Sequence, residues 1–485
     1  MTALLLGGEM PHWSDRSPAR GAPLRELAAT ARGHVLVVGP HEPELIEAIP
    51  ARQVTVLVRG VPDADELAGR WAGRAGIQVC CGSLAKLAAV PAYDTVVALD
   101  GLDRTGSTET ADLPWAAGVA QLLAVLRPGG RLLLSVANPV GLHRLYAGTG
   151  TPGDEAWSAF PATDPTRPAG LERLRAHLRS AGLDVLRDWA AHPSPESPSV
   201  LLDEDALTDP NLHGYLTSAL RRAGLPAGPL LADSRPLAAD LLRHGLAGGL
   251  APAWIVVAAY PGHHPSPLPD GLLGQERLVR TASGWTVGTL GPVPPGICLH
   301  DALLAAARSG DQPEFRTLLT AWQSGPHAAH PADALLRTPD GTLLPTTDAP
   351  AGTLSPAPGQ SPLQQLAAAL HDEGLAHLWP VEGTDSLLAA MSGLPVDPAP
   401  APRPTPSTLR ELTAAHDRLA EQLAEAKAQL TWYEQRTATL QSDLSRAHKI
   451  ITVLKATTGG RAATAVLGGV RRGKHLARAA LRRLS

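Results

Sequence analysis

Apolar runs of strand length alternate with stretches of helix length over residues 25–262. The runs lie at 34–38, 54–58, 77–80, 95–99, 131–136 and 253–259. Segments with apolar residues at helical spacing separate most of them, and the clearest are 113–126 and 170–182. Continuous apolar strands with helices between them are typical of a parallel sheet covered on both faces. The pattern predicts a doubly wound, Rossmann-like α/β domain over residues 25–262, preceded by a flexible arm at residues 1–24.

The alternation becomes weaker after residue 262. Residues 263–273 begin with a proline-rich stretch and predict a linker. Residues 274–394 predict a small α+β region, with a hairpin near its start and a helical stretch at 299–323. Residues 395–407 are rich in proline and predict a semi-rigid linker.

A heptad pattern extends over residues 408–456. Its seam positions step by three and four residues without a break, at Leu409, Leu412, His416, Leu419, Leu423, Ala426, Leu430, Tyr433, Thr437, Leu440, Leu444, Ala447, Ile451 and Leu454. This period predicts a long C-terminal coiled-coil helix, so we expect a homo-oligomer through residues 408–456. One long helix packed on its own domain is the alternative.

The end of the chain, residues 457–485, combines arginine and lysine with an apolar face and contains no acidic residue. This composition predicts a basic amphipathic tail that binds an anionic membrane surface, or an acidic partner, through residues 461–485. A solvated, frayed terminus is the alternative.

Composition narrows the class of protein. The 485-residue chain has a formal net charge of −4 and three cysteines. The cysteines are too few for a disulfide framework and no metal-ligand spacing is present, so we expect a reducing cytoplasm and no metal. The charge gives no indication of nucleic-acid binding, and no apolar run is long enough for a transmembrane helix. We expect a cytoplasmic protein, peripheral on the inner face of the cell membrane.

Three segments resemble class I S-adenosylmethionine-dependent methyltransferases. They are VLVVG at 35–39, YDTVVALDGLDR at 93–104 and LLAVLRPGGRLLLSVAN at 122–138. Segments 137–148 and 169–207 are similar to the methyltransferase part of bacterial surface-polysaccharide proteins, some of which terminate O-antigen chains. Those proteins join a methyltransferase, a kinase-like domain, a coiled coil and a membrane-seeking tail, in the order predicted here. The resemblance implies S-adenosylmethionine as cofactor and a glycan or lipid-linked saccharide as acceptor.

The resemblance implies cofactor contacts at the carboxyl ends of the first four strands of the domain. In this sequence they fall on Gly39, Pro40, His41, Arg59, Ser83, Asp100 and Gly101. His41 and Pro43 stand where glycines would let the backbone approach the cofactor closely. Arg59 stands where an acid would accept hydrogen bonds from the ribose hydroxyls, which a guanidinium cannot do. Ser83 stands where an acid for the adenine amine is common.

Two residues after the fifth strand are candidates for catalysis. Asn138 and His143 follow the run at 131–136, at the edge of the sheet where a substrate would bind. His143 could act as a general base for methyl transfer to a hydroxyl. A surface histidine without a catalytic role is the alternative.

The region 274–394 has a second, weaker resemblance. Residues 298–315 and 335–350 are similar to parts of a kinase, but phosphoryl transfer needs a lysine for the phosphates. No lysine occurs between residues 87 and 426. We therefore interpret the region as degenerate and kinase-like, or as a helical connector.

The altered cofactor contacts leave two interpretations of the whole chain. The first is a divergent methyltransferase that transfers a methyl group to a sugar hydroxyl or a phosphate in bacterial cell-surface glycan assembly. The second is a catalytically inactive methyltransferase-fold scaffold that oligomerises through its coiled coil and docks glycan enzymes at the membrane.

Overall fold

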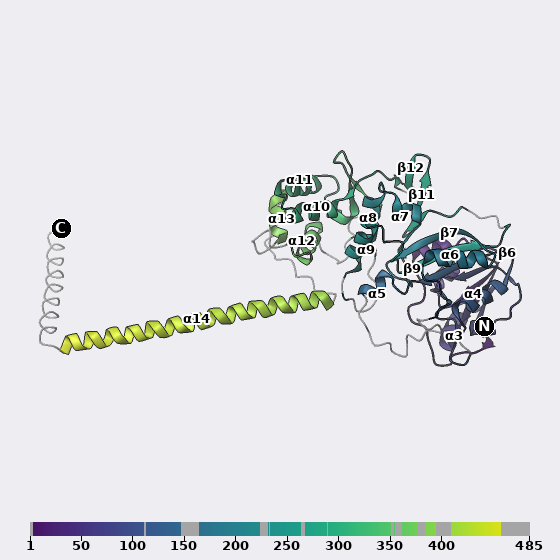
Figure 1. Ribbon diagram of the computed structural model, residues 1–485, viewed down its shortest axis with the longest axis horizontal. Helices are drawn as coiled ribbons and strands as arrows, with labels where there is room; N and C mark the ends of the chain where they lie inside the picture. Colours follow the sequence, from purple (N-terminus) through teal and green to yellow (C-terminus); the bar gives the residue numbers. More distant parts are fainter. Residues whose placement is uncertain are drawn as a thin grey trace. The chain divides into compact units, whose positions relative to one another are not determined.

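The computed structural model describes residues 3–110, 113–146, 164–223, 231, 233–262, 267–288, 290–350, 354, 361–375, 384–393 and 409–456 (Figure 1). The chain divides into two units, Met1–Glu411 and Leu412–Ser485. The first contains every described strand and all the described helices except α14 (Leu409–Ala456). Each unit is described by itself.

The first six strands of a 13-stranded sheet run parallel. In spatial order they are β1 (Leu4–Gly7), β4 (Ile77–Gly82), β3 (Gln53–Val58), β2 (His34–Val38), β5 (Tyr93–Ala98) and β6 (Leu126–Ala137). Strand β9 (Ala253–Ala259) pairs antiparallel with β6, and β7 (Asp184–His192) pairs antiparallel with β9. Strand order switches between β2 and β5, which is where open α/β sheets bind their ligands.

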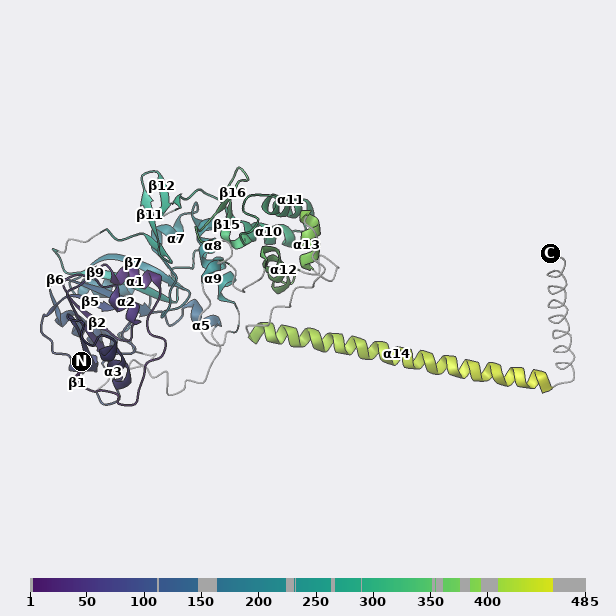
Figure 2. The same cartoon turned by 180° about the vertical axis from the view of Figure 1, so that it is seen from behind.

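Helices cover both faces of this sheet. Helices α1 (Ala22–Ala28), α2 (Pro43–Glu47) and α3 (Val61–Arg70) pack on one face, and α4 (Trp115–Ala124) and α6 (Leu171–Ser180) pack on the other. Figures 1 and 2 view the sheet from opposite sides. Successive residues of β2 alternate between the two cores: Val35 and Val37 face α1, whereas Leu36 and Val38 face α4. Both faces of β2 are therefore buried, which explains its unbroken apolar run.

All six predicted strands of the domain are present. Residues 34–38 and 253–259 match β2 and β9 to the residue. The Pro-Gly-Gly turn predicted before the fifth strand lies inside β6, where Gly129 has a φ of 74° and the register with β5 shifts. The sequence pattern did not include β7, because its apolar residues are interrupted by Arg187 and Asp188.

The sheet continues as an antiparallel meander beyond β7. Its strands are β8 (Val200–Leu202), β10 (Gly271–Leu273), β11 (Glu276–Thr281), β12 (Gly284–Val287) and β13 (Gly291–Pro292). The predicted hairpin is β11 and β12. The predicted linker at 263–273 is wrong at its end, because residues 271–273 form β10 by pairing with β8 and β11. A third core lies beside these strands, with helices α5 (Leu142–Tyr146), α7 (Glu204–Thr208), α8 (His213–Arg222) and α9 (Ser234–Arg243).

The region predicted as α+β has its own core. Its elements are β14 (Ile297–Cys298), β15 (Leu335–Arg337) and β16 (Leu343–Pro345), with helices α10 (Leu299–Arg308), α11 (Gln312–Gln323), α12 (Pro362–Asp372) and α13 (Thr384–Ser392). The helical stretch at 299–323 is two helices, divided at Gly310, whose φ is 71°. Asp311 caps α11 by accepting from the Glu314 amide at 3.0 Å, and Phe315, Leu318, Leu319 and Trp322 form its buried stripe.

The flexible arm predicted for residues 1–24 is wrong for the described residues 3–24. Residues 4–7 are β1, which lies beside β4, and residues 22–28 are α1. The chain between them crosses the carboxyl ends of β4, β3 and β2, with backbone bridges from Met10 to Gly60 and from Ala19 to His41. Sequence polarity did not reveal this path because its contacts are mostly polar.

Helix α14 covers nearly all of the predicted coiled-coil segment. Its described seam side chains include Leu419, Leu423, Leu430, Leu440 and Leu444, and each is 54–63% exposed within this single chain. Pairing with a second helix therefore stays a prediction. The predicted linker at 395–407 and the predicted tail at 457–485 lie outside the described residues. None of the described helices has both the length and the apolar character needed to cross a bilayer.

Candidate cofactor site at the carboxyl edge of the sheet

The fold gathers the predicted cofactor residues at one edge of the sheet. Gly39, Pro40 and His41 follow β2, Arg59 follows β3, Ser83 follows β4, and Asp100 and Gly101 come shortly after β5. Gly39 and Asp100 meet across the switch point: a Cβ on Gly39 would lie 3.5 Å from the Asp100 Cβ. Gly39 and Gly101 have φ values of 90° and 81°, in the left-handed region that favours glycine. Gly39 and Asp100 therefore lie side by side at the switch point, where the resemblance implies the cofactor.

The loop after β2 is filled by its own histidine. His41 is 3% exposed, and its Nδ1 lies 3.0 Å from the Gly39 carbonyl oxygen. Burial lowers the pKa of His41 to about 4, so the ring is neutral at neutral pH and its Nδ1 donates to that oxygen. The ring occupies space that a glycine would leave open to a ligand.

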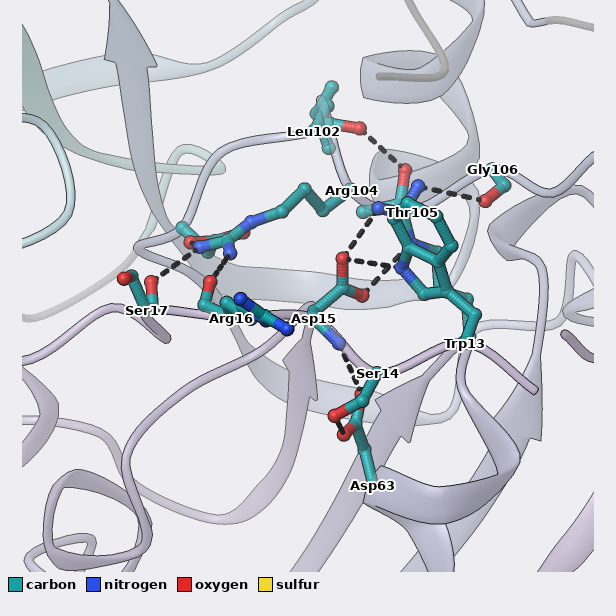
Figure 3. A network of polar contacts seen from close by, with 12 residues as sticks. Trp13, Ser14, Asp15, Arg16, Ser17, Asp63, Leu102, Arg104, Thr105 and Gly106 are labelled. Carbon is teal, nitrogen blue, oxygen red and sulfur yellow. Dashed lines mark hydrogen bonds and ion pairs between the residues drawn. The ribbon is translucent and has the colours of Figure 1, made fainter. Parts of the chain in front are cut away.

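Arg59 forms an ion pair with the N-terminal segment. Its Nε donates to Asp15 Oδ2 at 2.9 Å and its terminal nitrogen to Oδ1 at 2.5 Å, and the two side chains are only 1% and 2% exposed. The Trp13 ring centroid lies 5.4 Å from the Arg59 Cζ, and Trp13 Nε1 donates to Asp15 at 3.0 Å. Figure 3 shows Asp15 directed toward Trp13, with Ser14 beside Asp63. A buried arginine needs such a partner, because an unpaired guanidinium in the interior is very costly.

Asp100 is paired with Arg104. Arg104 Nε donates to Asp100 Oδ2 at 2.9 Å, and a second nitrogen contacts Oδ1. The same guanidinium donates to the backbone oxygens of Arg16 and Ser17, at 2.5 and 3.1 Å (Figure 3). Burial raises the pKa of Asp100 to about 7, against the lowering effect of Arg104. Arg104 thus joins the switch-point carboxylate to the N-terminal segment.

Backbone groups of the loop after β2 also contact the N-terminal segment. The Ala19 amide donates to the Pro40 oxygen at 2.9 Å, and the Glu42 amide donates to the Ala19 oxygen at 3.0 Å. The Glu42 amide lies directly before α2, and the Ala19 amide points to the carbonyl of the residue after Gly39. Both amides are therefore used within the chain.

Ser83 lies in a hydroxyl cluster. It is 1% exposed, accepts from the Ala85 amide at 3.3 Å, and lies 3.2 Å from the Thr110 hydroxyl. The Thr105 backbone oxygen is 3.5 Å away. These contacts close the loop after β5 over the end of β4.

The two catalytic candidates lie apart from this cluster, beyond β6. Asn138 is 1% exposed, and its amide nitrogen donates to the oxygens of Gly249 and Ala251 at 3.0 and 2.9 Å. Its oxygen accepts from the Val140 amide at 3.1 Å, so the side chain holds the end of β6 to the segment before β9. His143, on α5, has a buried Nδ1 with no hydrogen-bond partner among the described residues. Burial lowers the pKa of His143 to about 4, which makes it neutral and only weakly basic at neutral pH.

The sequence interpretation did not identify Trp13, Asp15 or Arg104. One signal could have located Asp15: an arginine after an apolar strand is expected to be buried and to require an acid. The segment Trp13–Ser17 offers such an acid, but 44 residues separate Asp15 from Arg59. Only the fold brings them together.

The edge fits S-adenosylmethionine in part. Gly39, Gly101 and Asp100 lie at the switch point, where the resemblance implies cofactor contacts. The ends of β3 and β4 are covered by Trp13, Asp15 and the cluster at Ser83. Among the described residues, no three histidine, cysteine, aspartate or glutamate side chains are grouped to hold a metal ion.

Comparisons with known proteins give only distant matches. No protein-family model and no curated protein matches the chain. A Burkholderia thailandensis 1,6-didemethyltoxoflavin-N1-methyltransferase structure, with bound 1,6-didemethyltoxoflavin and S-adenosylhomocysteine, is 16% identical over 49% of this chain and 76% of that chain, with a TM-score of 0.25. The N-methyltransferase NodS from Bradyrhizobium japonicum WM9, in complex with S-adenosylhomocysteine, is 15% identical over 36% of this chain and 79% of that chain, with a TM-score of 0.26. At this level of similarity, the activity has to be argued from the chain's own residues.

Proposed function

We propose that the chain is a divergent S-adenosylmethionine-dependent methyltransferase. The observation that carries the proposal is the strand order β4-β3-β2-β5-β6-β9-β7, in which β9 alone runs opposite to its neighbours. This order is that of the class I methyltransferases the sequence resembles. The switch point of that order is where Gly39, Asp100 and Gly101 meet.

The chemistry divides between cofactor and protein. When bound, S-adenosylmethionine would supply a methyl group on a sulfonium for transfer to an acceptor oxygen. The protein's contribution is then mainly to position the two reactants. Gly39 and Gly101 keep side chains away from the switch point, where a Cβ would lie 3.5 Å from the Asp100 Cβ and 3.1 Å from the Ser135 oxygen, respectively. Asp100 would supply a hydrogen-bond acceptor after Arg104 releases it. His143 is too weak a base to carry the proton at neutral pH, so we assign it a hydrogen-bonding role toward the acceptor.

The proposal extends to the acceptor and to the place where the protein acts in the cell. The order of parts supports a sugar hydroxyl or phosphate of a lipid-linked saccharide as acceptor, in bacterial cell-surface glycan assembly. Residues 408–456 would join copies of the chain into a homo-oligomer, and residues 461–485 would bind the inner, anionic face of the membrane. The exposed seam of α14 supports the first of these contacts.

A non-catalytic scaffold is the second candidate, and one observation favours it. The buried pair of Asp15 and Arg59, together with the His41 ring, occupies the edge where a cofactor would bind. In that case the methyltransferase fold would serve only as the head of an oligomer.

Titration calorimetry of the full chain with S-adenosylmethionine, and separately with S-adenosylhomocysteine, distinguishes the two candidates. One-to-one binding supports the methyltransferase. No binding by the wild type, and none by the variants described below, with all of them shown to be folded, would support the scaffold instead.

A further inference from the structure

The segment between β1 and α1, residues 8–21, crosses the candidate cofactor site as a strap. We call it the N-terminal strap. It contacts the site at three places: the end of β3, the carboxylate at the switch point, and the loop after β2. Each contact lies at a position where the resemblance implies a cofactor contact.

The first contact is at the end of β3. The Met10 amide donates to the Arg59 oxygen at 2.8 Å, and the Val61 amide donates to the Met10 oxygen at 3.1 Å. Asp15 neutralises Arg59, and the Asp15 amide donates to Asp63 Oδ2 at 2.9 Å. The strap also depends on a glycine here, because a Cβ on Gly60 would lie 2.3 Å from the Trp13 oxygen.

The second and third contacts are at the switch point and in the loop after β2. Arg104 holds the strap by two backbone oxygens while it pairs with Asp100. Ala19 pairs with both Pro40 and Glu42 in the loop after β2. The Glu42 amide cannot donate to the strap and to a cofactor at the same time, and Arg104 already occupies acceptor sites on both Asp100 oxygens.

The strap has few apolar anchors. Met10 and Ala19 are its buried apolar residues, whereas Pro11, His12, Ser14, Arg16, Ser17 and Arg20 are exposed. Segments held by polar contacts with little apolar burial open at a much lower free energy than the core. Such a segment can leave the edge while the sheet remains folded.

We propose that the N-terminal strap is an autoinhibitory closure of the cofactor site: the closed strap and bound S-adenosylmethionine exclude each other. This inference rests on the proposed function, and it explains why the edge where the resemblance implies a cofactor is filled. The affinity observed for the cofactor is then the intrinsic affinity reduced by the fraction of molecules with an open strap.

Two substitutions destabilise the closed state by different means. Asp15→Asn removes the carboxylate charge that faces the buried Arg59 guanidinium while the strap is closed, whereas in the open state Arg59 is hydrated. Gly60→Ala keeps all charges and places a Cβ 2.3 Å from the Trp13 backbone oxygen. The same Cβ would lie 2.8 Å from Asp63 Oδ2, a contact that the flexible side chain can relieve. The φ of Gly60 is −83°, which alanine adopts without strain. Asp240→Asn is the matched control, because Asp240 forms an exposed pair with Arg243 on α9.

The experiment measures the affinity of each full-length protein for S-adenosylhomocysteine by calorimetry, with folding checked by circular dichroism. We expect Asp15→Asn and Gly60→Ala to bind S-adenosylhomocysteine at least about tenfold more tightly than the wild type does. Asp240→Asn should have the same affinity as the wild type. If all four proteins bind with equal, measurable affinity, the proposal that the strap excludes the cofactor is wrong, and the proposed function is unaffected. Absence of binding in all four folded proteins would overturn the proposed function itself.

Discussion

The carboxyl edge of the large sheet and helix α14 differ in how completely their side chains are satisfied within one chain. At the edge, Arg59 and Asp100 each have an ion-pair partner, and the loop after β2 pairs with the strap. On α14, Leu423, Leu430 and Leu444 are 58–61% exposed. An exposed apolar seam of this length is typical of a helix that pairs with another helix, whereas Arg59 and Asp100 at the edge are paired within the chain. From this difference we expect α14 to act by association with another helix, and the edge to bind a ligand only after the strap opens.

The largest expected effect is on α14. Leu430→Asp places a charge in the seam, where it would cost several kcal/mol per layer if the seam is buried between helices. We expect the oligomer to dissociate, as measured by the molar mass from light scattering. Gln435→Asp, five residues further along and off the seam, is the matched control and should leave the mass unchanged. A wild-type monomer, or an unchanged mass for Leu430→Asp, would contradict the coiled coil.

The buried ion pair gives the next largest effect. Arg59→Met should lower the free energy of unfolding by up to about 3–5 kcal/mol, because it leaves Asp15 buried without a counter-charge. The double variant, Asp15→Leu with Arg59→Met, should lose much less free energy of unfolding than the sum of the losses in the two single variants. Denaturant unfolding of the four proteins measures the coupling. Additive losses would show that the two side chains do not interact as described.

Acidification should destabilise the first unit through its buried histidines. His41 and His192 are 3% and 0% exposed, and burial lowers the pKa of each to about 4. Their folded pKa lies below the unfolded value of 6.5, so this stability is present above pH 6.5 and is lost as pH falls toward 4. The expected loss is about 3 kcal/mol for each ring. His41→Asn should flatten the pH dependence of the free energy of unfolding between 6.5 and 4; an unchanged slope would place the His41 ring in solvent.

The smallest effect is expected for an exposed ion pair on the same domain. Arg70 on α3 contacts Glu44 and Glu47 at 3.0 Å, and all three side chains are 33–49% exposed. Arg70→Ala should change the free energy of unfolding far less than Arg59→Met does, because solvent screens exposed charges. If Arg70→Ala lowers the free energy of unfolding as much as Arg59→Met does, burial does not make the pair of Arg59 and Asp15 special.

The sequence predicted the strands of the domain well because they are buried on both faces. Val35–Val38 form a continuous apolar run for that reason, and the run coincides with β2. Strand β10 was placed in a linker because GLL is too short to carry a pattern, and it is a strand only through its pairing with β8 and β11. The period of α14 was visible because its seam repeats over many heptads.

The sequence predicted which residues lie at the candidate site, but it did not predict which residues contact them. Loop ends such as Gly39, Arg59 and Asp100 can be assigned to one edge from the order of the strands. Asp15 and Arg104 determine whether that edge is open, and their contacts join segments far apart in the chain. A polar segment such as residues 8–21 has no hydrophobic period, so its path across the edge is visible only in the folded structure.

Hydrogen–deuterium exchange on the full chain, with and without saturating S-adenosylhomocysteine, tests most directly the claim that the strap closes a cofactor site. The reporters are the Met10, Ala19 and Glu42 amides, which bond the strap to the edge. We predict faster exchange at Met10 and Ala19 when the ligand binds, because the strap leaves the edge. Slower or unchanged exchange at these two amides, under conditions where calorimetry records binding, would contradict the account.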